Sequence, residues 1–241
     1  MKKRIFAIGL GLTLLVTGIG FSSPVCQAAA SEGQKVVAID AGHQLRGNSE
    51  LEANGPGSST KKAKVTSGTS GKSSGLAEYQ LNLQVAKKVK KELVARGYKV
   101  VMIRTKHNVN ISNVQRAKVA NKAKADAFVR IHANSSESTS VAGALSIAPT
   151  NQNKYLSKKV RRASQRFSKK MIQKYCQATG AKNRGVMYTD TMTGINWCKV
   201  PVTIIEMGFM SNPTEDLKMA SASYQKKMVK GIADGIDAFL Q

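Results

Sequence analysis

Short runs of β-branched and apolar residues alternate along the chain with longer stretches in which apolar residues recur every three to four positions. The short runs predict strands at residues 36–41, 98–103, 127–131, 141–148, 186–189 and 201–205. The longer stretches predict helices at residues 75–96, 112–124 and 154–177, then a short helix from Pro213 and a final amphipathic one. This alternation predicts a single α/β domain with a twisted, mainly parallel sheet and helices on both faces.

Two stretches between the predicted elements are polar. Residues 44–75 are rich in Gly, Ser, Thr, Asn and Lys and predict a long loop without internal structure. Because loops of this length are uncommon and this one directly follows the first strand, we expect it to line a functional site. A second polar loop is predicted at residues 190–200, and residues 141–148 are predicted to form an edge strand.

The first thirty residues have a different pattern. Three basic residues precede an apolar stretch, and Ala28-Ala29-Ala30 supplies the small residues that a signal peptidase requires. The pattern predicts a secretory signal peptide at residues 1–30, cleaved near Ser31, with residues 31–241 as the functional domain. A secreted protein without stable membrane insertion follows from this. The alternatives are a retained membrane anchor, for which the apolar stretch is short, and lipid attachment at Cys26.

The composition is strongly basic. The chain holds 38 Lys and Arg against 14 Asp and Glu, a net charge of +24, and residues 31–241 keep +21 of it. Such a charge favours an anionic partner. An exported chain with 5% aromatic residues is a poor nucleic-acid binder, so an anionic cell envelope is the preferred partner. Ordinary solvated lysines are the alternative.

Three residues are candidates for a metal site. His43 and His132 each follow a predicted strand, and Glu78 lies on the apolar stripe of the helix predicted at residues 75–96. Because the carboxyl ends of parallel strands meet at one edge of a sheet, the two imidazoles and the carboxylate predict a catalytic zinc site with a fourth position for water. The alternatives are satisfied structural histidines and an acidic residue that complements a helix dipole.

Glu206 follows the strand predicted at residues 201–205 and is the candidate catalytic residue. A carboxylate beside zinc can take a proton from the attacking water and return it to the leaving amine. The alternatives are a fourth metal ligand and a salt-bridge partner. Asn134 is a candidate for binding a substrate carbonyl, whereas His107 lies in a polar turn and is predicted to be a surface residue.

Four motifs give the chain a clear family resemblance. They lie at residues 39–43, 78–83, 128–135 and 201–212. The sequence resembles the zinc-dependent N-acetylmuramoyl-L-alanine amidases, the type 3 amidases among the peptidoglycan hydrolases. The resemblance implies that zinc is held by His43, Glu78 and His132 and that Glu206 is catalytic. It also implies which bond is cleaved by zinc-activated water, namely the amide between N-acetylmuramic acid and the L-alanine of the stem peptide. The resemblance therefore implies that the protein acts at the cell wall on peptidoglycan, and its basic charge is expected to attract anionic wall polymers.

Three other functions remain open from the sequence. A zinc hydrolase of the same fold could cleave bonds within the stem peptide, and a non-catalytic relative could bind the wall. The presence of all four site residues argues against the second of these. A secreted nucleic-acid binder rests on charge alone.

Overall fold

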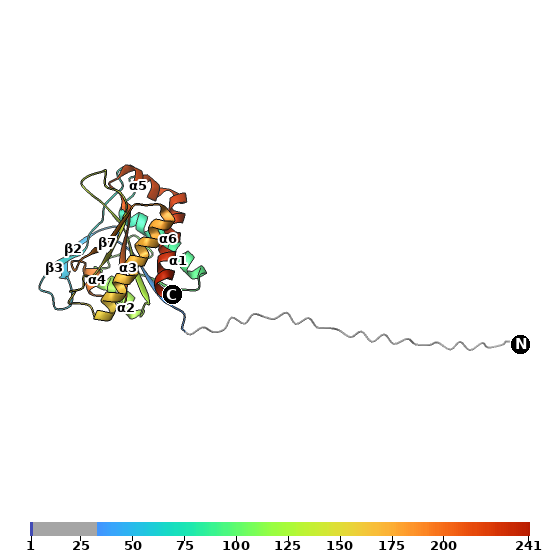
Figure 1. The fold of residues 1–241 in the computed structure, drawn as a ribbon, viewed down its shortest axis with the longest axis horizontal. Helices are drawn as coiled ribbons and strands as arrows, with labels where there is room; N and C mark the ends of the chain where they lie inside the picture. Colours follow the sequence, from blue (N-terminus) through green and yellow to red (C-terminus); the bar gives the residue numbers. More distant parts are fainter. Residues whose placement is uncertain (2–32) are drawn as a thin grey trace. The chain divides into compact units, whose positions relative to one another are not determined.

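A six-stranded sheet runs through the part of the chain that the computed structural model describes, residues 33–241 besides Met1 (Figure 1). The predicted signal peptide lies outside the described residues. The strand order is β4–β1–β5–β8–β6–β7. The strands are β1 (Val36–Ala41), β4 (Lys99–Met102), β5 (Ala127–Asn134), β6 (Ala144–Ala148), β7 (Asn183–Tyr188) and β8 (Val202–Phe209).

Helices cover both faces of this sheet, as predicted. They are α1 (Glu78–Ala95), α2 (Asn113–Lys122), α3 (Lys158–Thr179), α4 (Thr193–Asn196), α5 (Pro213–Ala220) and α6 (Ala222–Leu240). One apolar core joins α1, α3 and α6 to the sheet, and a second joins α2 and α4 to the opposite face. None of the helices in the described residues combines the length and the apolarity needed to cross a membrane.

The four strands on one side of the sheet, β4, β1, β5 and β8, run parallel to their neighbours. β6 runs antiparallel to β8, and β7 runs parallel to β6. The sheet is therefore mainly parallel, as the alternation of elements predicts. The prediction that residues 141–148 form an edge strand is wrong, because β7 adds to β6 and forms the edge itself. The runs of polar residues in β7 concealed its extent in the sequence.

The stretch from residue 44 to residue 75 is not a loop without internal structure. It contains the antiparallel hairpin of β2 (Asn48–Ala53) and β3 (Lys61–Val65). Both strands are mostly exposed and polar, so they lack the alternation of buried and exposed residues that identifies a half-buried strand. The related prediction, that this stretch lines a site, is confirmed by the pocket described below.

The hairpin is fastened to the loop that carries α4. Asn54 donates a hydrogen bond from its side chain to the carbonyl of Asp190, at 3.1 Å. Asn196 donates to the carbonyl of Asn54 at 3.0 Å, and the indole of Trp197 donates to the carbonyl of Ala53 at 2.9 Å. Lys62 adds a bond to the carbonyl of Thr191 at 2.8 Å. These bonds make the hairpin a fixed wall opposite the carboxyl ends of the central strands.

Candidate active site

The site begins where one face of the central strands changes from apolar to polar. On this face of β5, buried Phe128 is followed two and four residues later by Arg130 and His132. On the same face of β8, Ile204 is followed by Glu206. Because side chains alternate along a strand, each of these polar groups projects over the same sheet face at its carboxyl end. The neighbouring order of β1, β5 and β8 brings the polar ends together.

His43, Glu78 and His132 form a triangle of potential metal ligands. The Nε2 atom of His43 lies 3.2 Å from the Nδ1 atom of His132, and each lies 3.2 Å from Oε1 of Glu78. Two ligands of a tetrahedral zinc ion at bond lengths of about 2.0–2.1 Å lie about 3.3 Å apart. The triangle therefore has the dimensions of three corners of such a site.

The orientation of His43 is set by its neighbours. Its Nδ1–H donates to the carbonyl of Thr66 at 2.8 Å, which leaves the lone pair on Nε2, the atom that faces the triangle. The backbone of His43 is left-handed, with φ of 59°. The preceding residue must be a glycine, because a Cβ atom on Gly42 would lie 2.2 Å from the His132 ring.

Glu78 is 3% exposed at the first position of α1, so the prediction that it points inward is confirmed. Its Oε1 accepts hydrogen bonds from the side chain of Asn82 and the backbone N–H of Ala133, both at 3.1 Å. Burial by itself raises the pKa of Glu78, but its hydrogen bonds with His132 and His43 outweigh burial and lower the pKa. Burial also lowers the pKa of His132 to about 4. A charged carboxylate and a neutral imidazole are the ligand forms that a cation requires.

Glu206 stands opposite His132 in the register of β5 and β8. It lies within β8 and not at its end, since the strand continues to Phe209. Burial, followed by the negative charge of Glu78, raises the pKa of Glu206 to about 8. Its Oε2 atom is buried and has no hydrogen-bond partner among the described residues. A carboxyl group in this state can hold or release a proton near neutral pH.

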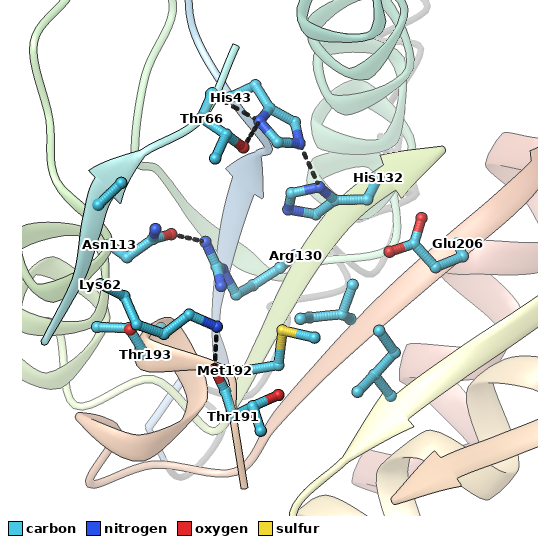
Figure 2. A pocket seen from close by; sticks show the side chains of 14 residues that line it. His43, Lys62, Thr66, Asn113, Arg130, His132, Thr191, Met192, Thr193 and Glu206 are labelled. Atoms are coloured by element: carbon cyan, nitrogen blue, oxygen red, sulfur yellow. Dashed lines mark hydrogen bonds between the residues drawn. The ribbon is translucent and has the colours of Figure 1, made fainter. Parts of the chain in front are cut away.

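A pocket of about 300 Å³ joins the triangle to Glu206 and continues along the hairpin (Figure 2). Its walls come from the ends of β5 and β8, from β3 and from the start of α4. His43 and His132 lie at one end, and Lys62 and Thr191 lie at the other (Figure 2). Asn134 is not among the residues that line this pocket, so its role in binding substrate stays a prediction. His107 is exposed and lies outside the pocket, as predicted.

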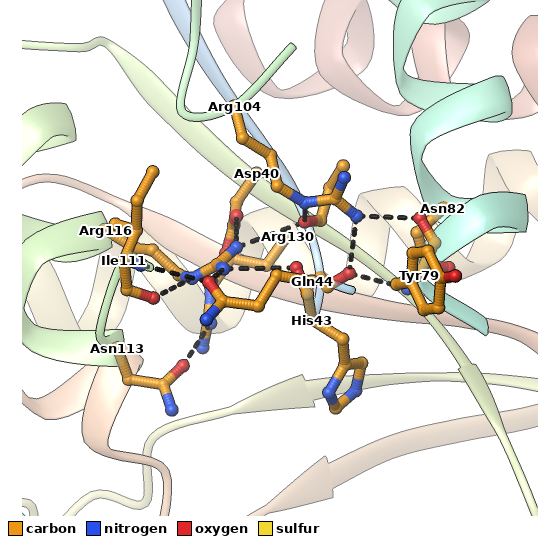
Figure 3. Close-up of polar contacts among 12 residues, drawn as sticks. Asp40, His43, Gln44, Tyr79, Asn82, Arg104, Ile111, Asn113, Arg116 and Arg130 are labelled. Atoms are coloured by element: carbon orange, nitrogen blue, oxygen red, sulfur yellow. Dashed lines mark hydrogen bonds and ion pairs between the residues drawn. The ribbon is translucent and has the colours of Figure 1, made fainter. Parts of the chain in front are cut away.

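Behind the pocket, three buried arginines surround one carboxylate (Figure 3). Asp40 accepts hydrogen bonds from Arg116 at 2.6 Å and from Arg130 at 2.9 Å. Arg116 also donates to the carbonyl of His43 at 3.1 Å, and Arg104 donates to the carbonyl of Gly42 at 3.0 Å. The arginines therefore hold the backbone turn that carries His43.

The sequence did not reveal the residues that support the triangle. Asn82 could have been found, because it lies one helical turn after Glu78 on the same face. Arg116 lies on the buried side of α2, where a charged residue is unusual. This unusual position could have indicated that Arg116 supports the site. Thr66 contacts Nδ1 of His43 through its backbone carbonyl and, at 3.2 Å, through its hydroxyl, and no local pattern in the sequence indicates this long-range contact.

Residues 37–238 match the family described as N-acetylmuramoyl-L-alanine amidase. The chain belongs to this family. The match covers most of the chain and includes all four motifs from which the resemblance was drawn. The prediction of an α/β amidase that hydrolyses peptidoglycan is thus confirmed at the level of the family.

Individual amidases support this assignment. N-acetylmuramoyl-L-alanine amidase LytC of Bacillus subtilis is 31% identical over 161 residues, which are 67% of this chain and 31% of LytC. This chain thus matches about a third of the length of LytC. The structure of the catalytic domain of the amidase CwlV from Bacillus (Paenibacillus) polymyxa is 30% identical, with a TM-score of 0.65 over 86% of this chain and 98% of that domain.

A third comparison concerns the fold alone. The structure of the amidase Ami1 from Mycobacterium smegmatis has a TM-score of 0.78 at 24% identity and covers 86% of this chain and 96% of Ami1. The predicted mainly parallel sheet with helices on both faces is therefore the fold of known amidases.

Proposed function

We propose that the chain hydrolyses the amide bond between N-acetylmuramic acid and the L-alanine of the peptidoglycan stem peptide, with zinc held by His43, Glu78 and His132. The observation that carries the proposal is the triangle of three ligand atoms, 3.2 Å apart, whose two histidines line the same pocket as the protonatable Glu206. Membership in the amidase family supports the choice of bond.

The donor set supports zinc in particular. Two imidazole nitrogens and one carboxylate oxygen are typical of catalytic zinc sites, which use three protein ligands and leave one position for water or substrate. Calcium and magnesium prefer sites made of oxygen ligands alone. When bound, zinc supplies a positive charge that polarises the amide carbonyl and lowers the pKa of a water molecule.

Glu206 supplies the proton transfers in the proposed mechanism. Its carboxylate accepts a proton from the attacking water, and the resulting carboxylic acid gives that proton to the nitrogen of the departing alanine. Burial raises the pKa of this carboxyl group to about 8, so it holds the proton between the two steps. The unpartnered Oε2 atom is available for both transfers.

The proposed reaction is tested by labelling new amino termini on purified peptidoglycan. The zinc-loaded protein is expected to release N-terminal alanine, and a chelator or the Glu206→Gln substitution is expected to abolish the release. New amino termini other than alanine would indicate a stem-peptidase instead. Adsorption to the wall without any new amino terminus, with zinc bound, would make the chain a wall-binding protein.

We also propose that the protein is exported and that its basic surface binds anionic wall polymers. The pattern at residues 1–30 supports export. Support for binding comes from three neighbouring helices that cover one face of the sheet, α1, α3 and α6. Their exposed cations include Lys87, Lys88, Lys90, Lys91, Lys158, Lys159, Arg162, Arg166, Lys169, Lys170, Lys226, Lys227 and Lys230.

Adsorption of the mature protein to purified walls is expected to fall steeply with salt, because a Debye length of about 10 Å at 0.1 M screens surface charges. Replacing Lys158 and Lys169 by Glu is expected to weaken adsorption further than the same change at Lys118 and Lys122 of α2. Adsorption that is independent of salt would contradict this proposal. The amino terminus of the exported protein, determined by mass spectrometry, tests cleavage near Ser31.

A further inference from the structure

The end of the pocket away from Glu206 is lined by two cations, Arg130 and Lys62 (Figure 2). The Arg130 side chain is only 5% exposed. Its Nε donates to Asp40, and its Nη2 donates to the side chain of Asn113 at 2.7 Å. Its Nη1 has no hydrogen-bond partner among the described residues, and Figure 2 shows the guanidinium directed into the pocket. A buried charged donor thus faces an open space.

Gly194 makes room for this guanidinium. A Cβ atom at position 194 would lie 2.1 Å from Nη1 of Arg130, so any other residue would displace the side chain. The close approach places Nη1 against the bare backbone of α4, where no side chain competes for it. The glycine at position 194 therefore leaves the Arg130 guanidinium accessible from the pocket.

The charges behind the pocket do not balance. Arg104, Arg116 and Arg130 are each at most 4% exposed, and the described residues provide Asp40 as the one carboxylate in ion pairs with Arg116 and Arg130. Burial, together with the charge of Arg116, lowers the pKa of Arg104 to about 10, which reflects this crowding of positive charge. Buried charges are stable when they are paired, so an anion in the pocket would complete the cluster.

Lys62 brings a second cation to the same end. It projects from β3 across the pocket and donates to the carbonyl of Thr191 at 2.8 Å. An ammonium group has three donors, so this bond leaves Lys62 able to contact a ligand. The acidic lining residue, Glu206, lies at the opposite end beside His132 (Figure 2). The pocket is therefore divided into a proton-transfer end and a cationic end.

The distance between the two ends matches a short peptide. Arg130 precedes His132 by two residues on β5, a step of about 7 Å along a strand. An extended substrate also spans about 7 Å over two residues. When the scissile carbonyl lies at the triangle, the carboxylate of the residue after L-alanine lies over the part of β5 that carries Arg130.

We propose that Arg130 and Lys62 form a subsite for a free carboxylate on the stem-peptide residue that follows L-alanine. This inference rests on the proposed amidase function, because it takes the scissile bond as its reference point. A carboxylate accepts charge-assisted hydrogen bonds from both cations, whereas a carboxamide in its place has half the acceptors and no charge. The pocket would therefore select stem peptides in which this group is not amidated.

The test compares two synthetic glycopeptides, N-acetylmuramoyl-L-alanyl-D-glutamate γ-methylamide with a free α-carboxylate, and the same molecule with that α-carboxylate converted to a carboxamide. Because the γ-carboxylate is blocked in both, the two compounds differ only in the group proposed to meet Arg130 and Lys62. The zinc-loaded protein is expected to cleave the free acid with a kcat/KM at least tenfold higher. Calorimetry with the Glu206→Gln variant is expected to show the same preference in binding, without turnover.

Two substitutions identify the residues responsible. Arg130→Gln is expected to reduce kcat/KM for the free acid ten- to a hundredfold and to remove the preference, since it deletes a hydrogen-bonded charge. Lys62→Met, at an exposed position, is expected to raise KM for the free acid about threefold while kcat stays the same, because three further hydrogen bonds, from Asn54, Asn196 and Trp197, still hold the hairpin. Lys61→Met is the matched control, because it removes the same charge from a neighbouring exposed residue that does not line the pocket.

The outcomes separate this inference from the proposed function. Equal cleavage and equal binding of the two glycopeptides would overturn the subsite and leave the amidase function intact. A preference for the free acid that survives both substitutions would also overturn it. Tighter binding of the free acid without cleavage of either compound by the zinc-loaded protein would support the subsite and contradict the amidase function.

Discussion

Glu206 pairs with His132 across the parallel strands β5 and β8, so a proton-transfer group and a candidate metal ligand occupy neighbouring positions on one sheet face. Adjacent strands lie about 4.8 Å apart, which is the spacing of groups that can act on the same amide bond. The register of the sheet, and not a flexible loop, determines this relationship. The position of Glu206 relative to the substrate is therefore expected to be rigid.

Replacing Glu206 by Gln is expected to lower kcat by about a hundred- to ten-thousandfold, the usual contribution of a general acid–base group. Gln has the same size but cannot accept and return the proton. Zinc content, measured by mass spectrometry of metals, is expected to be unchanged because Glu206 is not part of the triangle. Glu137→Gln is the control, since Glu137 is exposed and lies outside the pocket. Loss of zinc in Glu206→Gln would favour the alternative role of a fourth ligand.

Replacing Asn82 by Ala is expected to weaken zinc binding about ten- to a hundredfold, as is usual for residues that orient a metal ligand. Asn82 donates to Oε1 of Glu78 at 3.1 Å and to the carbonyl of Gly42 at 3.3 Å. Competition with a chromogenic chelator measures the affinity, and circular dichroism confirms the fold. Lys87→Ala, on the exposed side of α1, provides the control. An unchanged affinity for zinc would show that the hydrogen bond from Asn82 is not needed to orient Glu78.

The parts of the site that lie on strands with a clear apolar pattern could be predicted from the sequence. His43, His132 and Glu206 each follow a buried apolar run, and the rule that parallel strands end at one edge was enough to bring them together. Glu78 could be placed because its helix has a clear apolar stripe. In each case a local pattern determined the direction of the side chain.

The remaining features depend on contacts between distant segments. The β2–β3 hairpin is held by bonds from Asn54 to Asp190 and from Lys62 to Thr191, which no local pattern indicates. The apolar run at residues 127–131 predicts that Arg130 belongs to a buried strand, but its ion pair with Asp40 joins residues on two different strands. The partner of a buried charge cannot be predicted from a local sequence pattern, because it lies on a segment that is distant in the sequence.

Both cysteines that follow the predicted signal peptide are expected to react slowly with a thiol reagent in the native protein. Cys176 and Cys198 are free, and burial raises their thiol pKa to about 11 and about 12. Because the thiolate is the reactive form, little of it exists at pH 8. A colorimetric thiol titration is expected to detect two thiols promptly in guanidinium chloride and fewer than one in buffer. Absence of both thiols after unfolding would indicate a disulfide instead.

Replacing Asp40 by Asn is expected to destabilise the protein by about 3–5 kcal/mol at neutral pH, because it leaves Arg116 and Arg130 buried without a counter-charge. Urea unfolding measures the loss. Glu137→Gln, which removes an exposed carboxylate, is expected to change the free energy of unfolding by less than about 0.5 kcal/mol. A small effect of Asp40→Asn would show that the arginines find other partners.

The cost of Asp40→Asn is also expected to depend on pH. Burial raises the pKa of Asp40, but the charges of Arg116 and Arg130 outweigh burial and hold this pKa well below its ordinary value of 3.8. The unfolded chain therefore binds a proton at Asp40 before the folded chain does, so the stability from Asp40 is complete above about pH 5 and is lost as the pH falls below 3.8. The difference in unfolding free energy between the wild type and Asp40→Asn should accordingly shrink from pH 7 to pH 3. A difference that stays constant over this range would place the pKa of Asp40 near its ordinary value and contradict a tight ion pair.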